Sequence, residues 1–125
     1  SSGTFTGVAR FLKSRNPNIR CVAVEPAGAA ILKTGIVTHP KHIIQGTGYG
    51  IIPPHWDPSL ADDILTVTDS EAAEMTRRLG LEQGLHVGYS SGANVAAAIK
   101  LATSGSGRKQ VVTVLCDAGF KYSGL

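Results

Sequence analysis

The stretch Gly88-Tyr89-Ser90-Ser91-Gly92-Ala93-Asn94 places small, hydroxylated and amide side chains directly before an alanine-rich segment. It follows a short apolar run, so a strand, a tight turn and a helix start are predicted in that order. The first N–H groups of a helix have no partner within the helix, and the helix dipole favours negative charge beside them. The stretch can therefore dock an anionic or flat ligand, although serine before an apolar run is also typical of an ordinary helix N-cap.

A second candidate site is the opening segment Ser1-Ser2-Gly3-Thr4-Phe5-Thr6-Gly7, which is rich in glycine and hydroxyl groups. A helical pattern follows, with Val8, Phe11 and Leu12 on one face, and Asn16-Pro17 ends it. A loop of this composition before a helix start offers N–H and O–H donors around an anion, as phosphate sites do. An ordinary capped helix start is the alternative that these residues leave open.

A third candidate is the glycine-rich loop Gly46-Thr47-Gly48-Tyr49-Gly50, inside a long irregular stretch at residues 39–62. Glycines at alternate positions tolerate positive φ and let a backbone approach a ligand closely. Ordered loops of this length are usually functional rather than simple connections. The glycines do not follow a strand, so they do not make a dinucleotide-binding fingerprint.

The elements that must position these segments alternate between strand-like and helix-like patterns. Strands are expected at residues 19–25, 63–67 and 110–116, and helices after Gly7 and at residues 27–35, 69–80 and 95–101. Thr68-Asp69-Ser70-Glu71 is a capping box that opens the helix at 69. The alternation predicts an α/β fold with a mostly parallel sheet and flanking helices, in which ligands bind at the carboxyl edge of the strands. The opening segment begins where a strand should just have ended, and the Gly88 turn and Asp117 both follow expected strands, so these three can face one crevice.

The composition restricts the class of protein. The 125 residues are 42% hydrophobic and 17% charged, as in a globular domain with its own core. The net charge of +3 comes from scattered basic residues and indicates no nucleic-acid-binding stripe. No apolar run is long enough to cross a membrane, and no signal peptide is visible. Cys21 and Cys116 lie in β-type runs and are interpreted as buried thiols of a reducing, cytoplasmic compartment.

Two other kinds of site are disfavoured. The four histidines share no metal-ligand spacing, so no metal site is expected. Gly88-x-Ser90-x-Gly92 formally matches the nucleophile elbow of α/β-hydrolases, but no histidine follows His86 to complete such a triad.

Taken together and in order, the motifs resemble the cysteine synthase (O-acetylserine sulfhydrylase) and cystathionine β-synthase family, whose members are fold-type II enzymes dependent on pyridoxal phosphate. Residues 1–7 are similar to the family's phosphate loop, and residues 88–93 to its Gly-Ile-Ser-Ser-Gly-Ala turn. Residues 44–53 are similar to its Gln-Gly-Ile-Gly-x-Gly-Phe-Ile-Pro loop. Val24-Glu25-Pro26, Val67-Thr68-Asp69 and residues 117–122 match three further motifs, so the resemblance covers the whole chain.

The resemblance implies a role for each candidate segment. Four residues of the opening segment would hold the cofactor phosphate: Ser1, Ser2, Gly3 and Thr4. The hydroxyl of Ser90 would hydrogen-bond the pyridine nitrogen of the cofactor. Four residues of the glycine-rich loop would line the substrate side: Gly46, Thr47, Gly48 and Tyr49. Ser2 stands where glycine is common, and Tyr49 stands where many sulfhydrylases have a small residue but cystathionine β-synthases also have tyrosine, so the substrate stays open.

The resemblance also implies a reaction, and it implies that the family's catalytic lysine is not among these residues. It implies β-replacement that makes cysteine from an O-activated serine and sulfide, with an amino-acid substrate and a homodimer for the full-length protein. Cystathionine β-synthase or serine/threonine dehydratase activity, and a non-catalytic paralogue that retains the phosphate cradle, are the alternatives. The family's Schiff-base lysine precedes the phosphate loop, and no lysine here has a matching context. We therefore interpret residues 1–125 as a single partial domain, the C-terminal part of the family's large domain, and expect it to be inactive alone.

Overall fold

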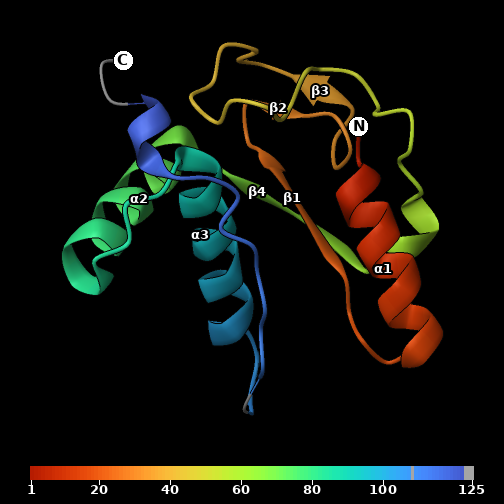
Figure 1. Ribbon diagram of the computed structural model, residues 1–125. Coiled ribbons are helices and arrows are strands. Elements are labelled where there is room, and N and C mark those ends of the chain that lie inside the picture. The colour runs from red at the N-terminus through yellow and green to blue at the C-terminus, as the bar shows by residue number, and fades with distance from the viewer. Residues whose placement is uncertain (108, 123–125) are drawn as a thin grey trace.

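A parallel pair of strands forms the centre of the computed structural model, which describes residues 1–107 and 109–122 (Figure 1). Strand β1 (Val22–Pro26) pairs with β4 (Asp63–Val67), from Val22 opposite Asp63 to Pro26 opposite Val67. Helix α1 (Gly3–Arg15) lies on one side of this pair, and α2 (Asp69–Gln83) and α3 (Tyr89–Thr103) lie on the other. The predicted α/β class with parallel strands is confirmed.

The core lies between the strand pair and the packed helices α2 and α3. Its buried members come from the long loop, β4 and both helices: Ile44, Val67, Ala72, Ala93, Ala96 and Ala97. Gly92 lets the two helices approach closely, because a Cβ there would lie only 2.5 Å from the Ala72 carbonyl oxygen. The alanine-rich sequence of α3 therefore reflects close helix packing.

Helix α2 begins with the predicted capping box. The Glu71 N–H donates to the Thr68 hydroxyl over 3.2 Å, and the Thr68 N–H donates to the Glu71 carboxylate over 2.8 Å. The helix runs past the expected end near Gly80 to Gln83, and Gly84 then adopts the left-handed conformation with φ 68°. At the start of α2, the two capping-box hydrogen bonds give acceptors to the N–H groups of Thr68 and Glu71, which have no partner within the helix.

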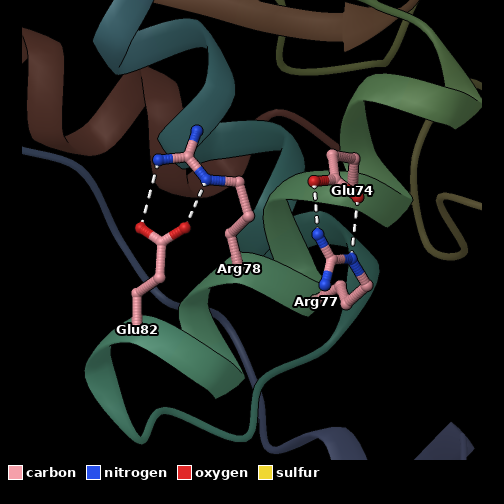
Figure 2. Close-up of polar contacts among 4 residues, drawn as sticks. All are labelled: Glu74, Arg77, Arg78 and Glu82. Carbon is pink, nitrogen blue, oxygen red and sulfur yellow. Dashed lines mark hydrogen bonds and ion pairs between the residues drawn. The ribbon is translucent and has the colours of Figure 1, made fainter.

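Two ion pairs cover the solvent side of α2 (Figure 2). The Arg77 guanidinium donates to both oxygens of Glu74, over 2.8 and 2.7 Å, and Arg78 donates to both oxygens of Glu82, over 2.7 and 3.1 Å. These guanidinium groups hold the pKa of Glu74 and of Glu82 below the ordinary range. Solvent screens both pairs because all four groups are exposed, so their contribution to stability is small.

Helix α1 begins earlier than predicted, within the opening segment at Gly3, and ends as expected before Asn16. Its buried residues are Thr6 and Ala9. The predicted apolar face is largely uncovered, because Val8 is 51% exposed and Phe11 is 58% exposed. The hydrophobic periodicity correctly predicted a helix here, but it did not predict which face of the helix is buried.

The expected helix at residues 27–35 is wrong, because this segment forms a small antiparallel pair of β2 (Ala29–Ala30) and β3 (Ile36–Val37). The buried carboxylate of Glu25 accepts the N–H groups of Leu32 and Lys33 over 3.1 and 2.8 Å. Those bonds fix a turn, and Gly35, with φ 72°, redirects the chain into β3. Hydrogen bonds to a side chain seven and eight residues earlier thus override the local helical pattern.

The expected third strand at residues 110–116 does not form within the part of the chain that the structure describes. This segment instead runs along α3, where the Asn94 amide donates to the Val114 carbonyl oxygen over 2.9 Å. Val112 is 86% exposed, and Cys116 is exposed rather than buried as expected, whereas Cys21 is buried. A β-branched run becomes a strand only when a neighbouring strand pairs with it, and no described strand lies beside this one.

Candidate functional site

The start of α1 presents donors without partners. Ser2, which precedes the helix, has φ 62°, and its side chain makes no capping hydrogen bond. The Gly3 N–H donates to the Ser1 hydroxyl over 3.3 Å, and the Thr6 N–H donates to the Ser2 carbonyl over 2.9 Å. Among the described residues, the N–H groups of Thr4 and Phe5 have no acceptor. This start can therefore hold an anion such as a phosphate group.

The segment at residues 54–57 closes one flank of α1. The His55 N–H donates to the Ser1 carbonyl over 3.1 Å, and the Thr6 hydroxyl donates to the His55 carbonyl over 2.7 Å. The Phe5 and Trp56 rings lie 5.5 Å apart. A hollow of about 340 Å³ opens there, lined by Gly3, Thr6, Arg10, Pro54, His55 and Trp56. No sequence pattern predicted this wall, because it depends on how the long loop folds back.

The glycine-rich loop uses the predicted conformational freedom. Gly46, Gly48 and Gly50 all have positive φ, at 80°, 57° and 74°. The Thr47 hydroxyl donates to the Ile44 carbonyl over 2.7 Å, and His42 Nε2 lies 3.0 Å from the Gly48 carbonyl oxygen. The Tyr49 side chain extends into solvent, since the residue is 73% exposed.

The two serines at the start of α3 have different environments. Ser91 is fully buried, and its hydroxyl accepts the Cys116 N–H over 2.9 Å. Ser90 is half-buried, and its hydroxyl has no partner in the described ranges. Gly88 precedes the helix without a side-chain cap. The hydroxyl of Ser90 is therefore the one available to a ligand.

Asp117 lies against the turn before α3 rather than in an open crevice. The Tyr122 hydroxyl donates to Asp117 Oδ2 over 2.6 Å, which raises the pKa of Tyr122. The Gly88 N–H donates to the Asp117 carbonyl over 3.2 Å, and Val87 forms an antiparallel bridge with Ala118. The expected strand before Gly88 is only this bridge. A small hollow of about 210 Å³ adjoins it, lined by Thr76, His86, Val87, Tyr89, Gly119 and Tyr122.

The candidate segments lie at one end of the strand pair. The Ala27 N–H donates to the Val67 carbonyl over 2.8 Å and so joins the carboxyl ends of β1 and β4. The Ile43 N–H donates to the Asp69 carboxylate, which brings the long loop to the start of α2. Figure 1 shows the first turns of α1 and α3 at this same end, with the long loop above them. In the described structure no hydrogen bond or ion pair joins Ser90 to residues 1–4.

Two kinds of feature do not occur in the described residues. They contain no group of three or more histidine, cysteine, aspartate or glutamate side chains placed to hold a metal ion. None of their helices is both long enough and apolar enough to cross a membrane.

Comparison with known proteins decides the family. The model of the family described as pyridoxal-phosphate dependent enzymes matches residues 1–117. The chain belongs to this family. It is 43% identical over 123 residues to cysteine synthase 3 of Caenorhabditis elegans, and 39% identical over 122 residues to the O-acetylserine dependent cystathionine beta-synthase of Bacillus subtilis. Each match covers 98% of this chain, but only 36% and 39% of those relatives.

Solved structures give the same result. The cysteine synthase of Entamoeba histolytica superposes with a TM-score of 0.92 at 33% identity, over 98% of this chain and 36% of its own. An O-ureido-L-serine synthase superposes with a TM-score of 0.91 at 35% identity, over 99% of this chain and 39% of its own. The predicted fold is confirmed as one that matches part of a fold-type II pyridoxal-phosphate enzyme.

Proposed function

We propose that this chain forms the phosphate and pyridine ends of a pyridoxal-phosphate site in an enzyme that makes cysteine by β-replacement. The observation that carries the proposal is the unpaired donor set at the start of α1, within the matched family. The N–H groups of Thr4 and Phe5 and the hydroxyls of Ser2 and Thr4 have no partners among the described residues, so they fit a phosphate group.

Each candidate residue receives a role in this proposal. Ser1, Ser2, Gly3 and Thr4 bind the phosphate, and the free hydroxyl of Ser90 hydrogen-bonds the pyridine nitrogen. Bound pyridoxal phosphate supplies an electron sink for negative charge that develops at the substrate Cα. A neutral hydroxyl supports a proton on the pyridine nitrogen less than a carboxylate does, so Ser90 tempers the sink and favours elimination and replacement at Cβ.

The glycine-rich loop is assigned to the substrate side. Gly46, Thr47, Gly48 and Tyr49 would line the space into which an O-activated serine enters. Tyr49, a residue type that cystathionine β-synthases also have at this place, and the likeness to an O-acetylserine dependent cystathionine beta-synthase support one alternative, in which homocysteine replaces sulfide as the nucleophile. That alternative uses the same cofactor site and differs only in the nucleophile that adds to the substrate.

A non-catalytic paralogue is the alternative from another class. Lys13 pairs with Asp62 over 2.6 Å, and Lys100 pairs with Glu71 over 2.7 Å. Lys109 donates to backbone carbonyls at the end of α3. These three lysines make structural contacts, and Lys33, Lys41 and Lys121 do not stand in the sequence context of the family's Schiff-base lysine, so this proposal takes the catalytic lysine from outside these residues.

The test uses the longest natural chain that carries these residues, loaded with pyridoxal phosphate. With O-acetylserine and sulfide we expect cysteine, and the 125-residue chain alone should give none. Cystathionine formed faster from homocysteine would select the first alternative, and 2-oxobutanoate formed from threonine would select a dehydratase. No product, together with an unshifted free-aldehyde absorbance of the cofactor, would contradict every enzyme assignment.

A further inference from the structure

The backbone of Gly88, which precedes α3, has both of its polar groups bound. Its N–H donates to the Asp117 carbonyl oxygen over 3.2 Å. Its carbonyl oxygen accepts the N–H of Ser91 over 3.1 Å and the N–H of Gly92 over 3.2 Å. The turn before α3 is therefore held by the first turn of the helix on one side and by Asp117 on the other.

Two side chains pack directly on this turn. A Cβ at Gly88 would overlap Asp117 Oδ1 and would lie 2.6 Å from Tyr122 Cε2. Tyr122 ends the short helix η2 (Gly119–Tyr122), and its ring lies 6.0 Å from the ring of Tyr89, the first residue of α3. Because glycine leaves this space to the carboxylate and the ring, both side chains bear on the backbone that leads to Ser90.

The Asp117 carboxylate depends on Tyr122 for its orientation. The Tyr122 hydroxyl donates to Asp117 Oδ2 over 2.6 Å. Asp117 Oδ1 is buried and has no partner in the described ranges. The hydroxyl of Tyr122 is thus the one described donor to this carboxylate, and a carboxylate with a single donor loses its fixed direction when that donor is removed.

The Ser90 hydroxyl has no contact of its own to hold it. Ser90 lies two residues after Gly88, is half-buried, and its hydroxyl has no partner in the described part of the chain. Its position is therefore set by the backbone of the turn. A group that must meet a ligand atom at hydrogen-bonding distance needs such a support from the residues behind it.

We propose that Tyr122 is a positioning residue, whose hydrogen bond to Asp117 fixes the Gly88 turn and so places the Ser90 hydroxyl for the pyridine nitrogen of the cofactor. The assignment rests on the proposed function for the identity of the ligand. The fixing of the turn by Tyr122 does not depend on it.

The test titrates pyridoxal phosphate into variants of the longest natural chain that carries these residues. Tyr122→Phe removes the hydroxyl and retains the ring, and it should weaken cofactor binding about three- to tenfold. In a Ser90→Ala background the same substitution should have little further effect, because the contact that Tyr122 positions is already absent. The control is Lys121→Ala, since Lys121 is an exposed neighbour in η2 and should leave binding unchanged.

Hydrogen exchange separates this proposal from the proposed function. Tyr122→Phe should speed exchange of the Gly88 and Ser91 amides and leave α1 unchanged. If the parent protein binds no pyridoxal phosphate, the proposed function fails, and the exchange result still decides whether Tyr122 fixes the turn. Unchanged exchange in Tyr122→Phe, or an equal fold-loss of cofactor affinity in the parent and Ser90→Ala backgrounds, would overturn the assignment.

Discussion

Neighbouring residues of the same type have different tasks at the start of α3. Ser91 is fully buried and holds residue 116 through its hydroxyl, whereas the hydroxyl of Ser90 has no partner within the described structure. The sequence motif contains both serines but does not say which one is structural. Burial and hydrogen bonding separate them.

We expect the two alanine variants to have complementary effects. Ser91→Ala should lower the free energy of unfolding by about 1 kcal/mol, because the Cys116 N–H loses its acceptor. Ser90→Ala should change it by less than about 0.5 kcal/mol, but should weaken pyridoxal-phosphate binding about three- to tenfold. Urea unfolding and cofactor titration measure the two quantities. The assignment is wrong if Ser90→Ala is the more destabilising variant, or if it binds cofactor as tightly as the parent.

At the scale of elements, helix packing depends on where glycine lies. Gly92 faces the Ala72 carbonyl and Thr76 at the contact between α3 and α2. Gly7 lies in α1 and has no atom within 4 Å of the position that a Cβ would occupy. Replacing glycine by alanine should therefore change the stability of the protein in opposite directions at these two positions.

Gly92→Ala should destabilise the protein by about 1–3 kcal/mol, because the methyl group forces the helices apart. Gly7→Ala should stabilise it by about 0.5–1 kcal/mol, because alanine loses less backbone entropy in a helix. Thermal and urea unfolding of both variants measure the difference. Equal effects of the two substitutions would contradict the described contact between α2 and α3.

The start of α2 should make stability depend on pH. A hydrogen bond from Lys100, helped by the Thr68 backbone, holds the pKa of Glu71 below its ordinary value of 4.5. The folded state therefore favours the carboxylate, and this stabilisation is present well above pH 4.5 and is lost as the pH falls through the lowered value. Glutamine at this position can still complete the capping box, but it carries no charge.

The stability difference between the parent and Glu71→Gln should accordingly be largest near neutral pH and shrink in acid. Urea unfolding between pH 7 and roughly pH 3 measures this difference. Lys100→Gln should reduce the pH dependence in the same range, because it removes the partner of Glu71. A difference that does not vary with pH would show that the ion pair does not contribute.

At the scale of the whole molecule, the sequence correctly predicted the features that depend on local residue patterns. The capping box at Thr68 and the hydroxylated start of α1 follow from neighbouring residues, and the parallel class follows from the alternation of strand-like and helix-like segments. The helix expected at residues 27–35 failed because the carboxylate of Glu25 captures amides seven and eight residues away. The strand expected at residues 110–116 does not form, because a strand needs a neighbouring strand to pair with. Strand propensity alone does not show whether such a neighbour is present.

The candidate site divides in the same way. The donors of residues 1–4 and the serine pair could be named from their motifs. His42, His55 and Trp56 could not, because their contacts arise from the fold of the long loop and have no characteristic spacing. The chain spans 36% and 39% of the length of the two relatives named above, so the activity of the whole protein is a proposal.

The most direct test of the central claim is a crystal structure of the longest natural chain with pyridoxal phosphate bound. We predict phosphate oxygens within hydrogen-bonding distance of the N–H groups of Thr4 and Phe5, and the Ser90 hydroxyl within hydrogen-bonding distance of the pyridine nitrogen. A phosphate group bound away from the start of α1, or a pyridine ring that does not contact Ser90, would contradict the account.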